Sequence, residues 1–370
     1  MPALNTVNIT LSQNTTDMEQ STKDFSREMW TFFDWLWDLT LLHLITLFIL
    51  ASLSFLVIRY CLEAIRIEDL DKKAVFITGC DSGFGYGLAL KCLENGITVF
   101  ASCMTEQGIG SLKSAAQKLN AERQLDAFLM DVTSEESVRM ATKRIENGCE
   151  KFGGLHAVVN NAGITGKHIA DDFFNLSEYQ KVTEINLFGP IRITHAMKKL
   201  LKKGRGRIIQ VASICARIGL PGLGPYTVSK YGISGYCDVI RQELRPFGIS
   251  VHILEPGFFN TPLINRQKID SEIQEAWNLA PEDVKNEYGE QFFNDSRKSS
   301  QDFLDTIASS RISLVVDAYF HAITAKFPRS RYQIGWDSIL LFIPMSYLPT
   351  GLQDYIFAAV GLFLPKPACH

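Results

Sequence analysis

The chain has 370 residues, of which 46% are hydrophobic and 21% charged, and its formal net charge is −3. This length allows one large α/β domain with an appendage, and the charge gives no indication of a nucleic-acid partner. The eight cysteines show no C-x-x-C spacing and the seven histidines are scattered, so we expect no metal site.

The N-terminal part of the chain is predicted to be a tail followed by a membrane anchor. Residues 1–29 are rich in Ser, Thr, Asn and Gln, which predicts a disordered polar tail. Residues 30–60 are expected to form the anchor, because residues 39–58 contain no formally charged side chain. A helix of about 20 residues spans about 30 Å, the thickness of a bilayer core. The alternatives are a cleaved signal peptide and a buried helix.

From residue 74 onward, short apolar runs alternate with helical stretches. The expected strands are residues 74–78, 97–101, 125–130, 155–160, 207–212 and 249–254. Gly96, Gly204 and Gly248 are expected to end helices between them. This alternation predicts an α/β fold, a doubly wound parallel sheet with helices on both faces. Such a sheet binds ligands at the carboxyl ends of its strands.

The alternation stops after Gly257. Residues 258–311 are expected to form a helical substrate lobe within a domain that spans residues 73–335. Residues 336–370 form an apolar C-terminal segment whose apolar runs are too short to span a bilayer. We expect this segment to pack on the domain or to enter a membrane surface.

A glycine-rich motif, Gly79-x-x-x-Gly83-x-Gly85, lies between the first expected strand and the following helix. Glycines at such a turn let the backbone approach a pyrophosphate, and the helix N-terminus offers free N–H groups to its negative charge. The motif predicts a dinucleotide site, although a plain glycine-rich turn has the same composition.

Tyr226 and Lys230 are four residues apart, so a helix places them on one face. Hydride transfer from an alcohol needs a matched proton transfer at the oxygen, and a phenol is a weak partner unless its anion is stabilised. Lys230 would supply the stabilising charge. Ser213 follows an expected strand, where its hydroxyl can hydrogen-bond a substrate oxygen. Each of these residues alone could equally be an ordinary surface or strand-end residue.

Together with Asn160-Asn-Ala-Gly163, these motifs resemble the short-chain dehydrogenase/reductase family. Residues 79–85, 226–232, 255–261 and 331–349 resemble its retinol dehydrogenase and 17β(3α)-hydroxysteroid dehydrogenase branch. The resemblance implies a Rossmann-like fold. It also implies a membrane-anchored enzyme that transfers hydride between NAD and a lipophilic secondary or allylic alcohol, giving a ketone or an aldehyde.

The resemblance also assigns site residues. It implies that Tyr226, Lys230, Ser213 and Asn186 are catalytic, with Asn186 supporting a water-linked proton relay. Ser213 and Tyr226 would bind substrate. Asp131 would contact the adenine, and Pro256 would lie near the nicotinamide. The full set of implied cofactor contacts is Gly79, Ser82, Gly83, Gly85, Ser102, Asp131, Asn161, Gly163, Tyr226, Lys230, Pro256 and Gly257.

The sequence favours NAD over NADP. NAD enzymes often end the second strand with an acidic residue that binds the ribose; here Ser102 occupies that position. NADP needs cations for its additional phosphate, but residues 98–111 contain no Lys or Arg. Asp81 and Ser82 stand where NADP-using members of the family often carry a basic residue.

The expected partners are a lipophilic small molecule and a membrane. Whether the chain forms a homo-oligomer stays open. More cations follow the expected span than precede it, which places the catalytic domain in the cytosol. These cations are Arg59, Arg66, Lys72 and Lys73 after the span, and Lys23 and Arg27 before it. The unpatterned thiols and the glycosylation sequons at Asn8 and Asn14 fit that orientation, whereas sequons at Asn175 and Asn294 fit the opposite one.

Several alternatives remain at this point. The endoplasmic reticulum membrane is the expected location, with a mitochondrial membrane as the alternative. A 3-hydroxybutyrate-type dehydrogenase shares part of the motif pattern. A lipid-binding protein or a membrane scaffold with a dinucleotide fold would share the lipophilic features, but it would not need the four catalytic residues.

Overall fold

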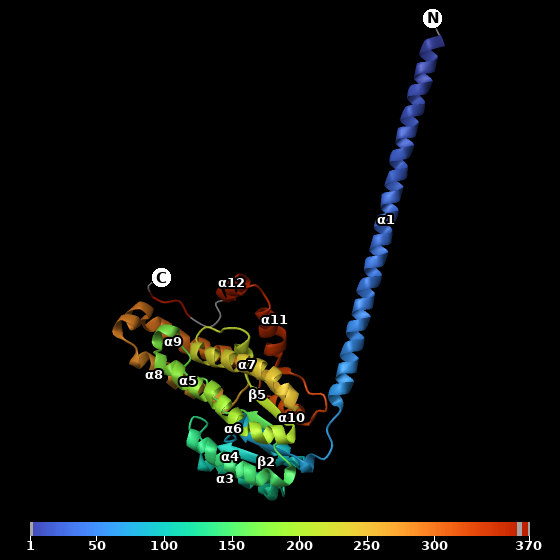
Figure 1. Cartoon of the computed structure of the whole chain (residues 1–370). Helices are drawn as coiled ribbons and strands as arrows, with labels where there is room; N and C mark the ends of the chain where they lie inside the picture. The colour runs from blue at the N-terminus through green and yellow to red at the C-terminus, as the bar shows by residue number, and fades with distance from the viewer. Residues whose placement is uncertain (1–2, 361–364, 369–370) are drawn as a thin grey trace. The chain divides into compact units, whose positions relative to one another are not determined.

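The computed structural model describes residues 3–360 and 365–368, and it divides the chain into two compact units at the junction between Ala64 and Ile65 (Figure 1). The first unit is one helix, α1 (Ala3–Ala64). The second unit contains the whole α/β domain. Each unit is described by itself.

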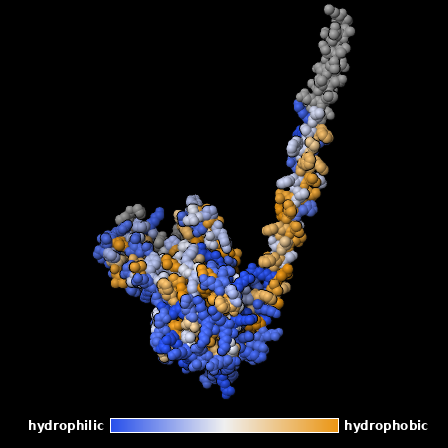
Figure 2. All heavy atoms as spheres, in the orientation of Figure 1, coloured by the Kyte–Doolittle hydropathy of each residue, from blue (hydrophilic) through white to orange (hydrophobic). Residues whose placement is uncertain are grey.

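Helix α1 contradicts the disordered tail expected for residues 1–29, because the described part of that segment is helical. Adding turns to an existing helix is easier than nucleating one, so an apolar helix can extend into the polar residues before it. Between Thr22 and Ala64 the helix is long and apolar enough to cross a membrane. Many of its apolar side chains, among them Trp30, Phe48 and Leu56, are exposed, and Figure 2 shows apolar residues along the visible face of this segment.

The domain is built on a seven-stranded parallel sheet in the order β3-β2-β1-β4-β5-β6-β7. The strands are β1 (Ala74–Thr78), β2 (Thr98–Cys103), β3 (Leu125–Leu129), β4 (Ala157–Asn160), β5 (Arg207–Val211), β6 (Ser250–Pro256) and β7 (Arg331–Ile334). The first six match the expected strands, and the doubly wound parallel sheet is confirmed. The chain order reverses between β1 and β4, which is the topological switch point.

Strand β7 was not predicted. It has four residues and lies at the sheet edge, with a buried Tyr332 and Ile334 and an exposed Gln333 between them. So short a run carries too little periodicity to be recognised. The parallel partner β6 provides the pairing that makes it a strand.

The helices cover the sheet on both faces. Helices α2, α3 and α10 pack on the face that contains Val75 and Ile77. Helices α4, α6 and α7 pack on the opposite face, which contains Phe76. The helices of the domain are α2 (Gly83–Glu94), α3 (Glu106–Lys118), α4 (Glu135–Cys149), α5 (Leu176–Thr183), α6 (Gly189–Gly204), α7 (Gly224–Leu244), α8 (Arg266–Leu279), α9 (Glu282–Ile307), α10 (Ser313–Thr324), α11 (Ile343–Ser346) and α12 (Thr350–Val360).

The expected helical insertion at residues 258–311 forms a separate lobe from α8 and α9. Its core joins Ile273 of α8 and Phe292 of α9 to Phe173, which precedes α5. The rings of Phe173 and Phe292 stack with their centroids 5.9 Å apart. An ion pair between Arg297 and Asp270, with two contacts of 2.6 Å, ties the two helices together.

The C-terminal segment divides between buried and exposed residues. Phe342 and Met345 pack into a core cluster with Ile214, which lies just after β5. Leu340 and Tyr355 are exposed. The segment therefore packs on the domain through one side and presents apolar side chains on the other, although residues 361–364 and 369–370 lie outside the described part.

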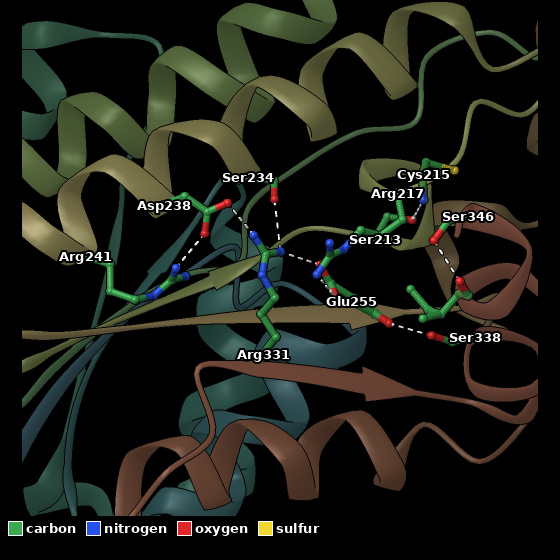
Figure 3. Close-up of polar contacts among 11 residues, drawn as sticks. Ser213, Cys215, Arg217, Ser234, Asp238, Arg241, Glu255, Arg331, Ser338 and Ser346 are labelled. Atoms are coloured by element: carbon green, nitrogen blue, oxygen red, sulfur yellow. Dashed lines mark hydrogen bonds and ion pairs between the residues drawn. The ribbon is translucent and has the colours of Figure 1, made fainter. Parts of the chain in front are cut away.

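The end of β6 is held by a charge network around Glu255, a fully buried carboxylate (Figure 3). Arg217 donates to one of its oxygens at 2.7 Å, and Arg331 of β7 donates to the same oxygen. Arg331 also contacts Asp238 of α7. The hydroxyl of Ser338 donates to the Glu255 carbonyl at 3.0 Å. This network fixes the backbone just before Pro256 and joins it to the helix that carries Tyr226.

Removing the central carboxylate should destabilise the domain. In Glu255→Ala, the half-buried Arg217 loses its carboxylate partner and Arg331 keeps only Asp238, and we expect the free energy of unfolding to fall by about 3 kcal/mol. Denaturant unfolding of the detergent-solubilised chain measures this change. The control Glu136→Ala removes an exposed i,i+3 partner of Arg139 and should leave the midpoint nearly unchanged. Equal midpoints for the two variants would contradict the structural role of Glu255.

Candidate active site

The glycine-rich turn after β1 forms one wall of a groove. Gly79 and Gly83 have φ of +69° and +62°, a backbone region that favours glycine. A Cβ on Gly85 would lie 2.4 Å from the Gly79 carbonyl oxygen, so only glycine fits there. The groove has a volume of about 1160 Å³. Because helix α2 begins at Gly83, its free N–H groups face the same region.

The switch point is closed by hydrogen bonds between β1 and β4. The Asn161 side-chain amide donates to the carbonyls of Thr78 and Gly79, both at 3.0 Å. The Thr78 hydroxyl accepts from the Asn161 backbone N–H at 3.0 Å. The Tyr319 hydroxyl of α10 donates to the side-chain oxygen Oδ1 of Asn161 at 3.2 Å. Asn161 therefore orients the glycine-rich turn as well as lining the groove. Sequence reasoning missed Thr78 and Tyr319, and only the position of Thr78 at the strand end could have indicated it.

The structure places Ser102 differently from the sequence prediction. Its side chain is buried, and Cys103 and Met104 line the groove at this strand end instead. The contact of Ser102 with the cofactor stays a prediction. The carboxylate near this position comes from Asp81, which accepts hydrogen bonds from the backbone N–H groups of Met104 and Thr105 at 2.8 and 3.0 Å.

The remaining predicted cofactor residues divide into two sets. Gly79, Ser82, Gly83, Asp131, Asn161 and Gly163 line the groove. Pro256 and Gly257 line an adjoining cavity, which shares Asn161 and Gly163 with the groove. Gly85 lies behind the turn and supports it. A glycine-walled groove at a helix N-terminus, continuous with a second cavity, fits the pyrophosphate and the two ends of a nicotinamide dinucleotide.

The loop after β6 shapes this second cavity, here called the reaction cavity. The buried Asp337 carboxylate accepts a hydrogen bond from the Phe258 backbone N–H at 2.7 Å. A Cβ on Gly257 would lie 2.0 Å from the same carboxylate, so glycine is required there. Burial raises the pKa of Asp337, and its backbone hydrogen bonds act in the opposite direction. The segment around Asp337, which carried part of the family resemblance, thus fixes Pro256-Gly257 in place.

Ser213, Tyr226 and Lys230 all line the reaction cavity. Ser213 follows β5, and its hydroxyl oxygen accepts from the Cys215 backbone N–H at 3.2 Å. Lys230 lies one turn after Tyr226 on α7, with Nζ 5.4 Å from the centre of the Tyr226 ring. Its Nζ donates to the carbonyl oxygen of Val211 at 3.2 Å.

Asn186 lies behind this site rather than in it. It belongs to a π-helical turn (Glu184–Phe188) and is 1% exposed. Its side-chain oxygen Oδ1 accepts a hydrogen bond from the Ile164 backbone N–H at 2.9 Å. Its side-chain nitrogen Nδ2 donates to the Ile164 backbone carbonyl at 2.7 Å and to the Ser229 hydroxyl at 3.1 Å. These bonds fix its orientation beside Gly163, on the side of the cavity where Lys230 lies. The proton relay through Asn186 stays a prediction.

Burial has the largest effect on the pKa values of Tyr226 and Lys230. It raises the pKa of Tyr226, and the neighbouring Cys215 thiol adds to the increase while the hydrogen bond with Ser213 opposes it. Burial also lowers the pKa of Lys230 to about 8. The sequence argument expected Lys230 to lower the pKa of the phenol, but within the protein alone desolvation is the larger effect. Cys215 is a further cavity residue that the sequence did not indicate.

A third cavity adjoins the reaction cavity, and the two share four lining residues. These residues are His168, Leu223, Phe258 and Ile264. The third cavity is lined mainly by α9 and by apolar side chains, and it is here called the distal cavity.

Comparisons with known proteins agree with this geometry. A family described as short chain dehydrogenase matches residues 73–272. The chain is 41% identical over 325 residues to the 3beta-hydroxysteroid dehydrogenase dhs-16 of Caenorhabditis elegans, covering 86% of this chain and 83% of that protein. It is 39% identical to 17-beta-hydroxysteroid dehydrogenase type 6 of Rattus norvegicus, covering 81% and 92%. It is also 39% identical to retinol dehydrogenase 5 of Homo sapiens, covering 80% and 89%.

The fold is found among solved structures. A short chain dehydrogenase/reductase from Burkholderia phymatum, solved in complex with NAD, has a TM-score of 0.60 and 20% identity, covering 81% of this chain and 99% of that chain. Levodione reductase has a TM-score of 0.58 at the same identity, covering 70% of this chain and 95% of that chain. At this level of identity the likeness shows the fold alone.

Proposed function

The chain belongs to the short-chain dehydrogenase family, and from that membership we propose that it oxidises the CH–OH group of a lipophilic alcohol, a retinoid or a hydroxysteroid, with NAD as the hydride acceptor. The observation that carries the proposal is the meeting of Ser213, Tyr226 and Lys230 in one cavity that continues into a glycine-walled groove. The names of the relatives, hydroxysteroid and retinol dehydrogenases, support this substrate class.

The residues of the reaction cavity divide the chemistry between them. When bound, the cofactor supplies a nicotinamide ring that takes the hydride from the alcohol carbon. Tyr226 takes the hydroxyl proton, so a hydride leaves the alcohol carbon, a proton leaves its oxygen and a carbonyl forms. Ser213 would donate its hydroxyl proton to the substrate oxygen and hold that oxygen toward Tyr226.

Lys230 has two roles in this proposal. Its charge would favour the Tyr226 phenolate, and its Nζ would bind the ribose hydroxyls next to the nicotinamide. Because burial lowers its pKa to about 8, Lys230 is poised to exchange a proton near neutral pH. Asn186 would connect Lys230 to solvent through water, completing the path by which the proton leaves.

The chain is proposed to prefer NAD over NADP because of Asp81. Its carboxylate lies against the backbone that follows β2, near where the ribose 2′ group of a dinucleotide sits. A 2′-phosphate at this position would approach a negative charge, with no cation on residues 98–111 to offset it. The buried Ser102 takes no part in the preference.

Membrane attachment is proposed through α1 and through the exposed apolar residues of the C-terminal segment. Exposed side chains there include Trp336, Ile339, Leu340, Tyr347, Leu352 and Tyr355. Retinoids and steroids concentrate in bilayers, so an anchored enzyme meets them where they are abundant. 3-Hydroxybutyrate is water-soluble and does not concentrate in bilayers, so this apolar surface favours the lipophilic substrate.

Replacing the proton acceptor should stop the reaction without removing the cofactor. In Tyr226→Phe we expect kcat for alcohol oxidation to fall by about a hundred- to ten-thousand-fold, while NAD affinity stays near that of the wild type. Initial rates and NAD titrations on membranes containing the full chain measure both. Tyr231→Phe, at an exposed position on the same helix, is the matched control. Turnover of Tyr226→Phe near the wild-type rate would refute the mechanism.

The cofactor preference should depend on the charge of Asp81. Asp81→Asn removes the charge and keeps an acceptor for one of the two backbone N–H groups, so the ratio of kcat/KM for NADP to that for NAD should rise by about tenfold. Ser102→Ala should leave this ratio unchanged. A wild-type enzyme that prefers NADP, or a ratio that responds to Ser102 and not to Asp81, would overturn the assignment.

The catalytic domain is proposed to face the cytosol from the endoplasmic reticulum membrane. The seven described cysteines are all free, six of them buried, which suits a reducing compartment. Protease treatment of sealed microsomes should digest the domain without detergent, with glycans confined to Asn8 or Asn14. A protected domain that carries a glycan at Asn175 or Asn294 would reverse the orientation, and recovery of the chain in mitochondria would move its location.

A further inference from the structure

Three serines of α9 line the distal cavity. Ser296, Ser299 and Ser300 lie at spacings that place them on one face of the helix together with Phe303 and Leu304. Of the three, Ser296 is buried, Ser300 is half-buried and Ser299 is exposed. Most of the other lining residues are apolar, among them Leu223, Ile264 and Ile269.

Ser296 is the informative serine of the three. It is 2% exposed, and its hydroxyl oxygen has no hydrogen-bond partner among the described residues. A serine or threonine within a helix commonly donates to the carbonyl of the preceding turn, as Thr306 of the same helix does to Asp302 at 2.8 Å. Ser296 makes no such bond. A buried polar group without a partner is unfavourable unless a ligand or water satisfies it.

The surroundings hold Ser296 in position. The next residue, Arg297, forms a two-contact ion pair with Asp270 of α8, which restrains this turn of α9. The boundary between the two cavities carries a further polar group, His168, whose Nδ1 lies 3.4 Å from Glu272 and has no hydrogen bond within the described chain. The distal cavity thus offers polar groups both at its entrance from the reaction cavity and on α9.

We propose that Ser296 binds a second oxygen function of the substrate, at the end remote from the reacting hydroxyl, with His168 lining the path to it. This inference rests on the proposed function, because it takes Tyr226 as the site of oxidation. The preferred substrate is then a rigid lipophilic alcohol with an oxygen at each end, such as a steroid diol or a hydroxyketosteroid. An alcohol whose far end is only hydrocarbon, such as retinol, leaves Ser296 without a partner and binds less well.

Substrates that differ only in the remote oxygen test the proposal. The full chain in membranes is assayed with NAD on a 3-hydroxysteroid that carries a 17-ketone, on the same steroid without the 17-oxygen, and on all-trans-retinol. We expect kcat/KM for the difunctional steroid to exceed that for its deoxy analogue by about 5- to 100-fold. In Ser296→Ala this advantage should disappear through loss on the difunctional substrate, with the deoxy analogue changed by less than about threefold.

Two further variants make the result specific. Ser296→Thr keeps a hydroxyl and should retain most of the preference. Ser271→Ala removes an exposed serine of α8 outside the cavity and should change neither substrate. Equal kcat/KM values for the steroid and its deoxy analogue in the wild type would overturn the proposal. This comparison needs no variant, so it holds even if Ser296→Ala does not accumulate. A Ser296→Ala variant that keeps the preference for the difunctional steroid would also overturn the proposal. A wild-type chain that turns over none of these alcohols would instead refute the proposed function.

Discussion

The parallel pairing of β1 with β4, at the point where the strand order reverses, is the constraint on which the rest of the site depends. The hydrogen bonds between Asn161 and the end of β1 join two strands that are more than 80 residues apart in sequence. They fix the glycine-rich turn and open the groove that fits a dinucleotide. Strand β5, next to β4, then carries Ser213 to the same edge, and α7 brings Tyr226 and Lys230 over it. Without this pairing, no element would place a proton acceptor beside a bound nicotinamide.

Sequence reasoning found the features that repeat or that have fixed spacing. Six strands, the glycine-rich turn and the pair Tyr226 and Lys230 follow from local patterns, and the family and its retinol and hydroxysteroid branch are confirmed by the comparisons. Strand β7 and the turn around Asp337 could not be predicted, because their roles arise from contacts with the loop after β6. The contact of Ser102 with the cofactor stays a prediction, because its side chain is buried and the groove beside it is lined by Cys103 and Met104. The polar composition of the first residues of α1 predicted disorder. Composition alone does not show that the apolar helix after these residues can extend through them.

Burial of Tyr226 and Lys230 disfavours the charged forms that the proposed proton transfer uses. Desolvation raises the pKa of Tyr226 and lowers that of Lys230, so both groups are driven toward their neutral forms. A cationic nicotinamide ring bound between them would favour the phenolate and offset this cost. Proton transfer is then coupled to cofactor binding, which limits the reactivity of the buried tyrosine when no cofactor is present. Ser296 in the distal cavity is likewise a buried polar group that a bound ligand would stabilise.

The central claim is that the alcohol carbon gives its hydride directly to a nicotinamide while Tyr226 takes the proton. The most direct measurement uses a steroid alcohol with deuterium on the carbinol carbon, incubated with NAD and membranes that contain the full chain. The account predicts one deuterium on C4 of the reduced nicotinamide for each carbonyl formed, and neither product with Tyr226→Phe. Carbonyl formation with the deuterium released to water, or deuterium transfer that persists at the wild-type rate in Tyr226→Phe, would contradict it.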